Sequence, residues 1–227
     1  MRILAVSDEE SKSLWDYYVP GKLDGYDLIL SCGDLKASYL TFLVTMGRAR
    51  LLYVHGNHDG SYESAPPEGC DDIDGHLVEY NGVRILGLGG CLRYHPGAHQ
   101  YTEREMERRI APLRRAVKRA GGVDIVIAHT PPRGYGDLED AAHRGFESFV
   151  GLIEEWRPAY FLHGHTHLRY STSAVRELSL GSTRIVNVSE RFEFDFPDKE
   201  YAPEQKGELI RLTKYKEKTS LWGANKL

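Results

Sequence analysis

Short apolar runs that end in polar clusters recur along this chain of 227 residues. The runs occupy residues 3–6, 28–30, 51–54, 125–128 and 159–162, and Asp, Asn, Gly or His follows each of them within a few positions. Runs of this length between turn residues are typical of buried strands rather than helices. Ligand sites of open α/β sheets form beyond the carboxyl ends of the strands, so we expect these polar clusters to converge on one edge.

Other segments predict helices, a hairpin and further strands. Residues 102–119 open with a T-x-x-E capping box and contain Pro112, which predicts a kinked surface helix. An apolar stripe from Phe146 to Trp156 predicts a second helix. Asn81-Gly82 predicts a hairpin between residues 76–80 and 83–88, so the sheet arrangement should be mixed. Residues 183–188 and 208–212 read as later strands, and residues 196–207 as a loop.

Length and composition limit the classes of protein to which the chain can belong. Its 227 residues suffice for a core without disulfides, so we expect one domain over residues 1–227. The formal net charge of −4 gives no strong nucleic-acid signal. The three cysteines are widely spaced without a C-x-x-C pair, which favours a reducing compartment and opposes a thiolate zinc site. With no long apolar stretch, the sequence predicts a cytoplasmic protein without a membrane partner and leaves its oligomeric state open.

The polar clusters contain enough ligand groups for two divalent metal ions. They supply three carboxylates, one amide and three imidazoles, from Asp8, Glu10, Asp34, Asn57, His129, His165 and His167. Such a mixed oxygen and nitrogen set suits Mn²⁺, Fe or Zn²⁺ better than Ca²⁺. Two such ions can share a carboxylate, polarise a phosphoryl oxygen and convert a bridging water into a nucleophilic hydroxide. His58, next to Asn57, is a candidate general acid for the leaving oxygen.

Each of these residues taken alone also has an ordinary structural explanation. His129 by itself is more often a hydrogen-bonded histidine at the end of a strand, and His165-Thr166-His167 is compatible with a polar turn. Asp8 and Asp34 are compatible with turn formers or helix N-caps, and so is Asp59.

The ordered set resembles the calcineurin-like metallophosphoesterases, whose pattern is D-x-H, G-D, G-N-H-D/E, H, G-H-x-H. In this chain the corresponding segments are Asp8-Glu9-Glu10, Gly33-Asp34, Gly56-Asn57-His58-Asp59, His129 and Gly164-His165-Thr166-His167. The resemblance implies an αββα sandwich of two mixed sheets flanked by helices, with a dinuclear site at the carboxyl ends of the strands. It also implies that Asp34 bridges two ions, with Asp8, Glu10 and His167 on the first, Asn57, His129 and His165 on the second, and His58 over the phosphate.

One position departs from the family pattern. Glu10 stands where the family usually has histidine, so a charged oxygen replaces a neutral nitrogen. We expect the first ion to be retained, because glutamate is a competent ligand, and the preference to shift toward harder ions, with Mn²⁺ first. The alternative is a first site that is only partly filled.

Two loops contain candidate substrate-binding residues. Arg93, His95 and His99 lie in a glycine-rich segment between a strand and a helix, where they could hold phosphate, and Tyr94 or Tyr101 could stack on a base. His143 precedes the second predicted helix and could face an anion. The alternatives are a solvated loop and a polar helix start. The basic residues between positions 104 and 119 are interspersed with glutamates, which favours a solvated face.

The sequence therefore predicts a metal-dependent phosphoesterase, a phosphodiesterase or a phosphatase, that acts on a small nucleotide-like phosphate ester. A catalytically weak protein-binding module on the same fold is the first alternative, supported by Glu10. A nuclease is the second, although the sequence lacks a dense basic groove.

Overall fold

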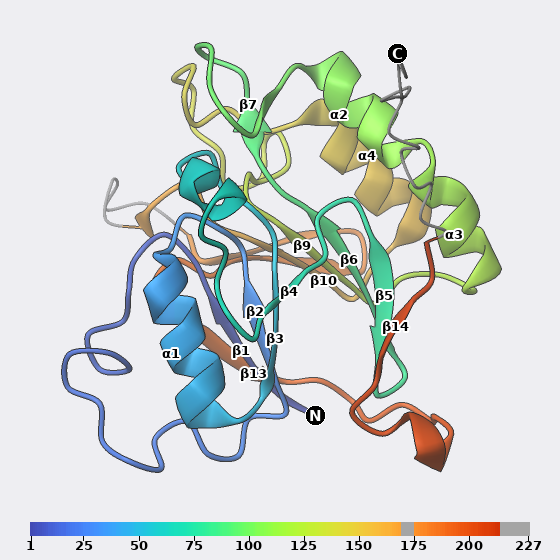
Figure 1. Cartoon of the computed structure of the whole chain (residues 1–227). Coiled ribbons are helices and arrows are strands. Elements are labelled where there is room, and N and C mark those ends of the chain that lie inside the picture. Colours follow the sequence, from blue (N-terminus) through green and yellow to red (C-terminus); the bar gives the residue numbers. More distant parts are fainter. Residues whose placement is uncertain (169–174, 214–227) are drawn as a thin grey trace, which may run out of the picture.

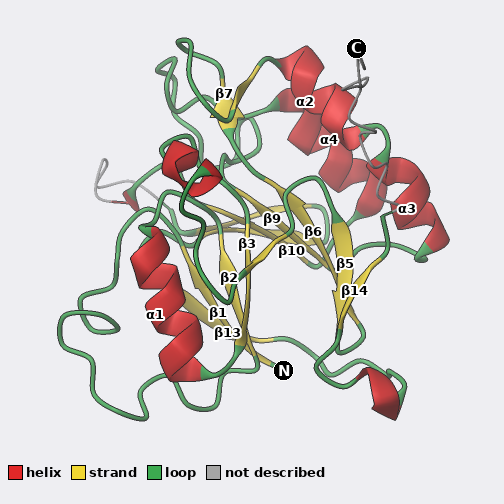
Figure 2. Cartoon of the chain, in the orientation of Figure 1, coloured by secondary structure: helices red, strands yellow, loops and turns green. Residues whose placement is uncertain are grey.

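The computed structural model describes residues 1–168 and 175–213. Two central sheets face one another, and helices cover the outer side of each sheet (Figures 1 and 2). The predicted αββα sandwich of two mixed sheets is confirmed. The predicted single domain also includes residues 214–227, which lie outside the described residues.

The first sheet is built mainly from the N-terminal third of the chain. Its strand order is β13-β1-β2-β3-β4. The bounds are β1 Arg2–Val6, β2 Leu28–Ser31, β3 Arg50–Tyr53, β4 Asp71–Asp72 and β13 Phe192–Asp195. Strands β1 to β4 are parallel and β13 is antiparallel to β1. Helix α1, Ala37–Gly47, connects β2 to β3 and packs on the outer face.

The second sheet contains strands from the middle and the end of the chain. Its order is β11-β12-β10-β9-β6-β5-β14. The bounds are β5 Leu77–Tyr80, β6 Val83–Leu88, β9 Ile125–Ala128, β10 Tyr160–His163, β11 Glu177–Leu180, β12 Thr183–Asn187 and β14 Leu209–Arg211. Helices α2 Glu103–Ile110, α3 Leu113–Arg119 and α4 Glu147–Trp156 cover its outer face. A short pair, β7 Cys91–Leu92 and β8 Gln100–Tyr101, lies apart from both sheets.

Three apolar clusters hold these layers together. The central cluster joins side chains of both sheets, such as Leu30 and Ile127, and the outer two join each sheet to its own helices. Because β2, β3, β9 and β10 are buried on both faces, they read in the sequence as continuous apolar runs rather than as alternating ones.

The predicted elements are found with small differences in their bounds. The hairpin at Asn81-Gly82 is confirmed, and both residues have positive φ, 46° and 74°, as its tight turn requires. The predicted kinked helix is in fact two helices that meet at Pro112, because proline lacks the N–H that would continue the helix. Residues 196–207 form a loop with one 3₁₀ turn, Pro203–Gln205. Among the described residues, no helix is long and apolar enough to cross a membrane.

Candidate metal centre

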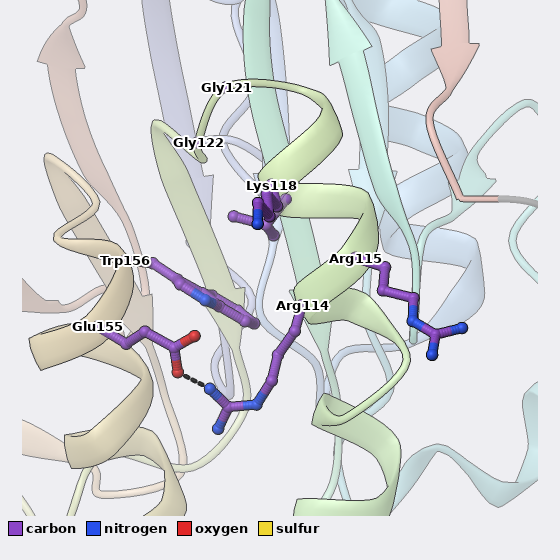
Figure 3. A pocket seen from close by; sticks show the side chains of 8 residues that line it. Arg114, Arg115, Lys118, Gly121, Gly122, Glu155 and Trp156 are labelled. Carbon is purple, nitrogen blue, oxygen red and sulfur yellow. Dashed lines mark ion pairs between the residues drawn. The ribbon is translucent and has the colours of Figure 1, made fainter.

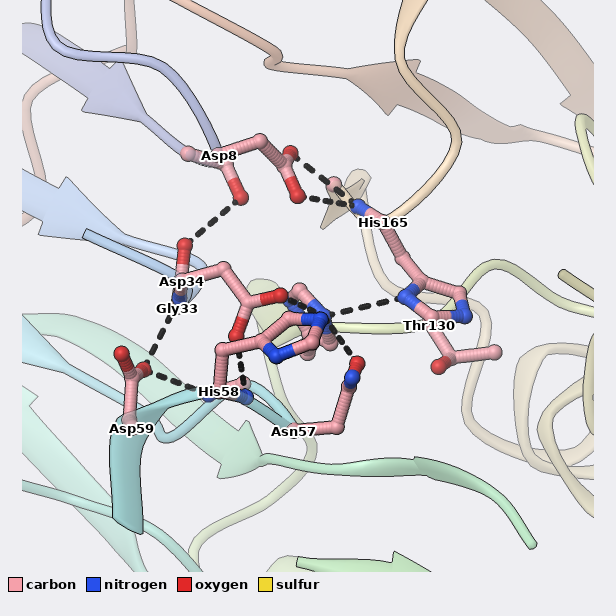
Figure 4. Close-up of polar contacts among 12 residues, drawn as sticks. Asp8, Gly33, Asp34, Asn57, His58, Asp59, Thr130 and His165 are labelled. Atoms are coloured by element: carbon pink, nitrogen blue, oxygen red, sulfur yellow. Dashed lines mark hydrogen bonds and ion pairs between the residues drawn. The ribbon is translucent and has the colours of Figure 1, made fainter. Parts of the chain in front are cut away.

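The polar ends of strands from both sheets meet at one end of the sandwich. β1, β2 and β3 contribute from the first sheet, and β9 and β10 contribute from the second. A hydrogen bond of 2.8 Å joins Nδ1 of His129, after β9, to the carbonyl oxygen of Cys32, after β2. The expected single edge is therefore formed by two facing sheets, and Figure 4 shows Asp8, Asp34, Asn57 and His165 converging there.

Backbone conformation at this end is unusual, and it brings the loops close together. Asp8, Asp34 and His165 have positive φ values of 63°, 56° and 67°. Such conformations are costly for residues with a Cβ and cluster at functional sites. Gly56 and Gly164 leave no space for a side chain, because a Cβ would overlap Asp34 at the first and Ser7 at the second. These glycines allow the ligand-bearing loops to approach one another.

Three side-chain acceptors surround the Nε2 atom of His129. Oδ1 of Asn57 and Nδ1 of His165 lie 3.1 Å from it, and Oδ2 of Asp34 lies 3.2 Å away. The ligand atoms of Asp34, His129 and His165 all lie within 4.8 Å of one another. The structure thus brings together the four residues predicted for the second ion.

The ring orientations in this group fit a metal ion. Nδ1 of His129 donates to the Cys32 carbonyl, and Nε2 of His165 lies 2.7 Å from the carbonyl oxygen of Ala142. Because carbonyl oxygens only accept, these contacts direct the other nitrogen of each ring toward the centre. The four atoms at the centre are Nε2 of His129, Oδ1 of Asn57, Nδ1 of His165 and Oδ2 of Asp34. One proton can form a hydrogen bond between only a few of these atoms, whereas a divalent ion can coordinate all of them.

The charges of the centre also favour a cation. Burial alone would raise the pKa of Asp34, but His129 and the hydrogen bond from the His58 amide hold it well below its usual range. Burial would lower the pKa of His129, but Asp34 outweighs this effect and raises it to about 9. Burial and then His129 lower the pKa of His165 to about 3, so its ring is neutral and able to act as a ligand.

Asp59 holds the loop that carries Asp34, the predicted bridging residue. Its Oδ2 accepts hydrogen bonds from the backbone amides of Asp34, at 2.8 Å, and Gly56, at 2.7 Å. Burial, followed by the charge of Asp34, raises the pKa of Asp59. The sequence left Asp59 as either a turn former or a helix N-cap, and these contacts fit a turn former better.

The residues predicted for the first ion are arranged differently. Both carboxylate oxygens of Asp8 accept from the His165 backbone amide, at 2.9 and 3.1 Å. Oε1 of Glu10 lies 3.3 Å from Nζ of Lys36. Nδ1 of His167 lies 2.8 Å from Oε1 of Glu9, the residue adjacent to the predicted ligand. A carboxylate at Nδ1 favours the histidine tautomer whose Nε2 can bind metal.

His58, the predicted general acid, is hydrogen-bonded to Asp34, the predicted bridging residue, through its backbone amide. Its amide donates to Oδ1 of Asp34 at 2.8 Å, and its side chain is exposed. The imidazole is near enough to contribute to the low pKa of Asp34. This arrangement leaves the ring able to reach a substrate oxygen.

The predicted substrate residues lie in two loops. The Arg93 guanidinium donates to Glu105, at 2.9 Å, and to the Gln100 carbonyl. The His99 ring stacks on His55 with centroids 4.4 Å apart, and burial lowers its pKa. His95 is exposed, and its Nδ1 lies 2.8 Å from the Pro96 carbonyl oxygen.

His143 lies beside a predicted metal ligand. Its ring centroid is 5.3 Å from that of His165, and its Nδ1 lies 2.9 Å from Oδ1 of Asp140. Of the four predicted substrate residues, His143 alone has a ring contact with a predicted ligand among the described residues.

A surface hollow of about 440 Å³ lies elsewhere, between α3 and α4 (Figure 3). Arg114, Lys118 and Trp156 line it, and Arg114 forms an ion pair with Glu155. Trp156 precedes β10 in the chain, whereas the ligands follow β10, so the hollow is at the opposite end of the strands. The basic residues of the hollow, such as Arg114 and Lys118, belong to the helix surface that the sequence predicts to face solvent.

Several groups that support the centre were not identified from the sequence. The carbonyl oxygens of Cys32 and Ala142 are backbone atoms, which any residue type can supply, so no sequence signal marks them. The hydroxyl of Tyr94 lies 3.5 Å from Nδ2 of Asn57, although the sequence suggested only a stacking role for this residue. The sequence signal that could have pointed to Tyr94 is its position in a loop that follows a strand.

Comparison with known proteins yields a family and one curated relative. The model of the calcineurin-like phosphoesterase superfamily domain matches residues 1–195. UPF0046 protein K07C11.7 of Caenorhabditis elegans is 28% identical over 156 residues, which cover 65% of this chain and 51% of that protein. The match thus spans only about half the length of this relative.

Two solved structures have a similar fold. TT1561 of Thermus thermophilus aligns with a TM-score of 0.56 and 19% identity, over 83% of this chain and 89% of that one. GAP50, the anchor in the inner membrane complex of Plasmodium, aligns with a TM-score of 0.51 and 8% identity, over 84% and 71%. At these identities the likeness concerns the fold alone.

Proposed function

The chain belongs to the calcineurin-like phosphoesterase superfamily, and from this premise we propose that it hydrolyses a small, nucleotide-like phosphodiester or phosphomonoester with two divalent metal ions. Mn²⁺ is the proposed ion, with Fe or Zn²⁺ as alternatives, because the ligand set is rich in carboxylates and contains imidazoles but no thiolate. The proposed location is the cytoplasm, in keeping with the three free cysteines.

The convergence of Asp34, Asn57 and His165 on Nε2 of His129 is the observation that carries this proposal. A buried group of four potential ligand atoms with few hydrogens among them is costly unless a cation occupies its centre. Asp34, His129 and His165 form the candidate metal group within the described chain.

In the proposed mechanism, Asp34, Asn57, His129 and His165 would hold a divalent ion, which would supply Lewis acidity toward the phosphoryl group and the attacking water. Asp34 stays ionised, because its pKa is held well below its usual range, and it would serve both ions. Asn57 and His165 direct their ligand atoms inward, since a backbone carbonyl fixes the His165 ring. His58 would hold a proton and donate it to the leaving oxygen from the exposed side.

His143 and His95 remain the proposed substrate contacts, of which His143 has the better placement. Its Nδ1 lies 2.9 Å from Oδ1 of Asp140, which fixes the ring beside His165, where the ring can donate a hydrogen bond to an anionic substrate. The Arg93 charge is already matched by Glu105, so we propose for Arg93 a weaker contribution to phosphate binding.

A protein-binding module is the second candidate function, and the Glu10–Lys36 ion pair favours it. In that case a lysine ammonium would neutralise a carboxylate that the first ion otherwise requires. GAP50 is an anchor with a similar fold, but at 8% identity it supports no more than the capacity of this fold for such a role.

The deciding experiment combines metal analysis with hydrolysis. The purified chain would be loaded with Mn²⁺, Zn²⁺ or Fe²⁺ and assayed on p-nitrophenyl phosphate, bis(p-nitrophenyl) phosphate and cyclic nucleotides, with His129→Ala as the inactive control. We expect about two ions per chain and metal-dependent hydrolysis. Bound metal without hydrolysis of any of these esters would favour the binding module.

A further inference from the structure

Tyr94 brings a hydroxyl group to the edge of the metal centre. It lies in the loop between β7 and β8, and its Oη atom is 3.5 Å from Nδ2 of Asn57. Oδ1 of the same amide faces Nε2 of His129, at 3.1 Å. The two ends of the Asn57 side chain therefore connect Tyr94 to the metal-binding group.

The direction of this hydrogen bond leaves the phenolic hydrogen available. An amide nitrogen only donates, so Nδ2 of Asn57 is the donor and the Tyr94 oxygen is the acceptor. A phenol oxygen can accept one hydrogen bond while its own hydrogen donates another. Within residues 1–168 and 175–213, the Tyr94 hydroxyl has no acceptor for this hydrogen, and its side chain is partly exposed.

The surrounding loop fixes the position of Tyr94. The side chain of Gln100, which is only 4% exposed, accepts from the backbone amides of Tyr94 and His95 at 3.3 and 3.4 Å. The His95 ring packs edge-on against Tyr94, with centroids 4.2 Å apart. The amide of Gly90, directly before β7, donates to the carbonyl oxygen of His55 at 2.7 Å, which ties the start of this region to the loop that carries Asn57.

We propose that Tyr94 is a further catalytic residue of this site, whose phenolic O–H donates a hydrogen bond to a non-bridging oxygen of the substrate phosphoryl group. This inference rests on the proposed function. A neutral donor of fixed position interacts more strongly as negative charge grows on that oxygen, so it stabilises the transition state more than the ground state. Both monoesters and diesters carry non-bridging oxygens, so the contact does not depend on the leaving group.

The test compares Tyr94→Phe with Tyr17→Phe. Each variant removes one phenolic hydroxyl, but the Tyr17 side chain is 73% exposed and has no hydrogen bond to a predicted ligand within the described residues. We expect Tyr94→Phe to lower kcat/KM by roughly 10- to 100-fold, the scale of one hydrogen bond to a charged group. The loss should be the same for p-nitrophenyl and alkyl esters, and Tyr17→Phe should match wild type.

A binding measurement separates this inference from the proposed function. Inorganic phosphate is titrated calorimetrically into Mn²⁺-loaded wild type and Tyr94→Phe, and metal content is measured in both. Weaker phosphate binding by the variant with unchanged metal content supports direct contact, even if wild type hydrolyses none of the esters. Unchanged phosphate binding and kcat/KM would overturn the inference, and so would loss of metal, which would assign Tyr94 to the orientation of Asn57 only.

Discussion

The Oδ2 atom of Asp59 lies 2.8 Å from the backbone nitrogen of Asp34 and fixes the loop that carries this predicted bridging residue. The same oxygen accepts from the amide of Gly56, so one buried side chain joins the loops after β2 and β3. Ligands held by such outer contacts lose less freedom when metal binds.

Replacing Asp59 by alanine should therefore weaken both the fold and the metal centre. The buried amide of Gly56 and the partly buried amide of Asp34 would lose their acceptor, at about 1–3 kcal/mol for a buried amide. We expect a lower free energy of unfolding in urea and a lower metal content. Asp198→Ala is the control, because its side chain is 92% exposed and its loss should change stability by less than about 0.5 kcal/mol. Equal stability of the two variants would show that Asp59 does not support the loops.

Asp34→Asn tests the bridging role directly. The substitution keeps the shape of the side chain but removes the charge that one carboxylate would offer to both ions. We expect loss of most activity and reduced affinity for both ions, measured by chelator competition and elemental analysis. Metal content and turnover equal to those of wild type would contradict a dinuclear centre bridged by this residue.

The pH dependence of metal binding follows from His129. The pKa of His129 in the metal-free protein is about 9, above the ordinary value of 6.5. Protonated His129 therefore stabilises the metal-free protein fully below pH 6.5, and this stabilisation is lost as the pH rises through 9. A metal ion must displace this proton. Apparent affinity for Mn²⁺ should therefore rise by up to about tenfold per pH unit between pH 7 and 9. Competition with a chelator at each pH measures this affinity. An affinity that does not change between about pH 7 and 9 would show that His129 is not a ligand.

His58→Ala separates chemistry from metal binding. The exposed side chain has no hydrogen bond in the described structure, so metal content should stay near that of wild type. Turnover should fall by roughly 10²- to 10⁴-fold, the scale of a lost general acid. The loss should be smaller for p-nitrophenyl esters, whose leaving group needs no proton. If the variant instead lost its metals, His58 would be a ligand.

Strand ends and their polar residues could be predicted from the sequence because both depend on local pattern. The buried strands β2, β3, β9 and β10 appear as apolar runs. Asp34 is the third residue after β2, and His129 follows β9 directly. Helix α1 was not predicted from the sequence. Lys36 forms no side-chain cap at the start of the helix, and the buried residues of the helix include the adjacent pair Tyr39 and Leu40, so no regular apolar stripe is visible.

Side-chain directions near the first ion could not be predicted in the same way. Asp8 has a φ of 63°, and this turn determines which of Glu9 and Glu10 faces His167. The choice depends on backbone angles that the residue types alone do not specify. The acceptor roles of Cys32 and Ala142 were equally hidden, since every residue has a backbone carbonyl.

Glu10 is the position at which the chain leaves the family pattern, and its variants test the first ion. If Glu10 exchanges its contact with Lys36 for a metal ion, Glu10→Gln should weaken that ion by removing the charge. Glu10→His should shift the preference from Mn²⁺ toward Zn²⁺, because an imidazole nitrogen is a softer ligand than a carboxylate oxygen. Titration of each variant with both ions, followed by metal stoichiometry and activity, measures these effects.

Lys36→Ala supplies the matched control for this prediction. Its side chain is 73% exposed, so removing the ammonium should affect the fold little while freeing the Glu10 carboxylate. If the lysine competes with the first ion, the variant should bind that ion more tightly than wild type, whereas Glu10→Gln should bind it less tightly. Opposite shifts in the two variants follow only when one carboxylate is shared between lysine and metal. Identical metal dependence of wild type, Glu10→Gln, Glu10→His and Lys36→Ala would show that Glu10 is not a ligand, and that Asp8, Asp34 and His167 are the residues left to hold the first ion.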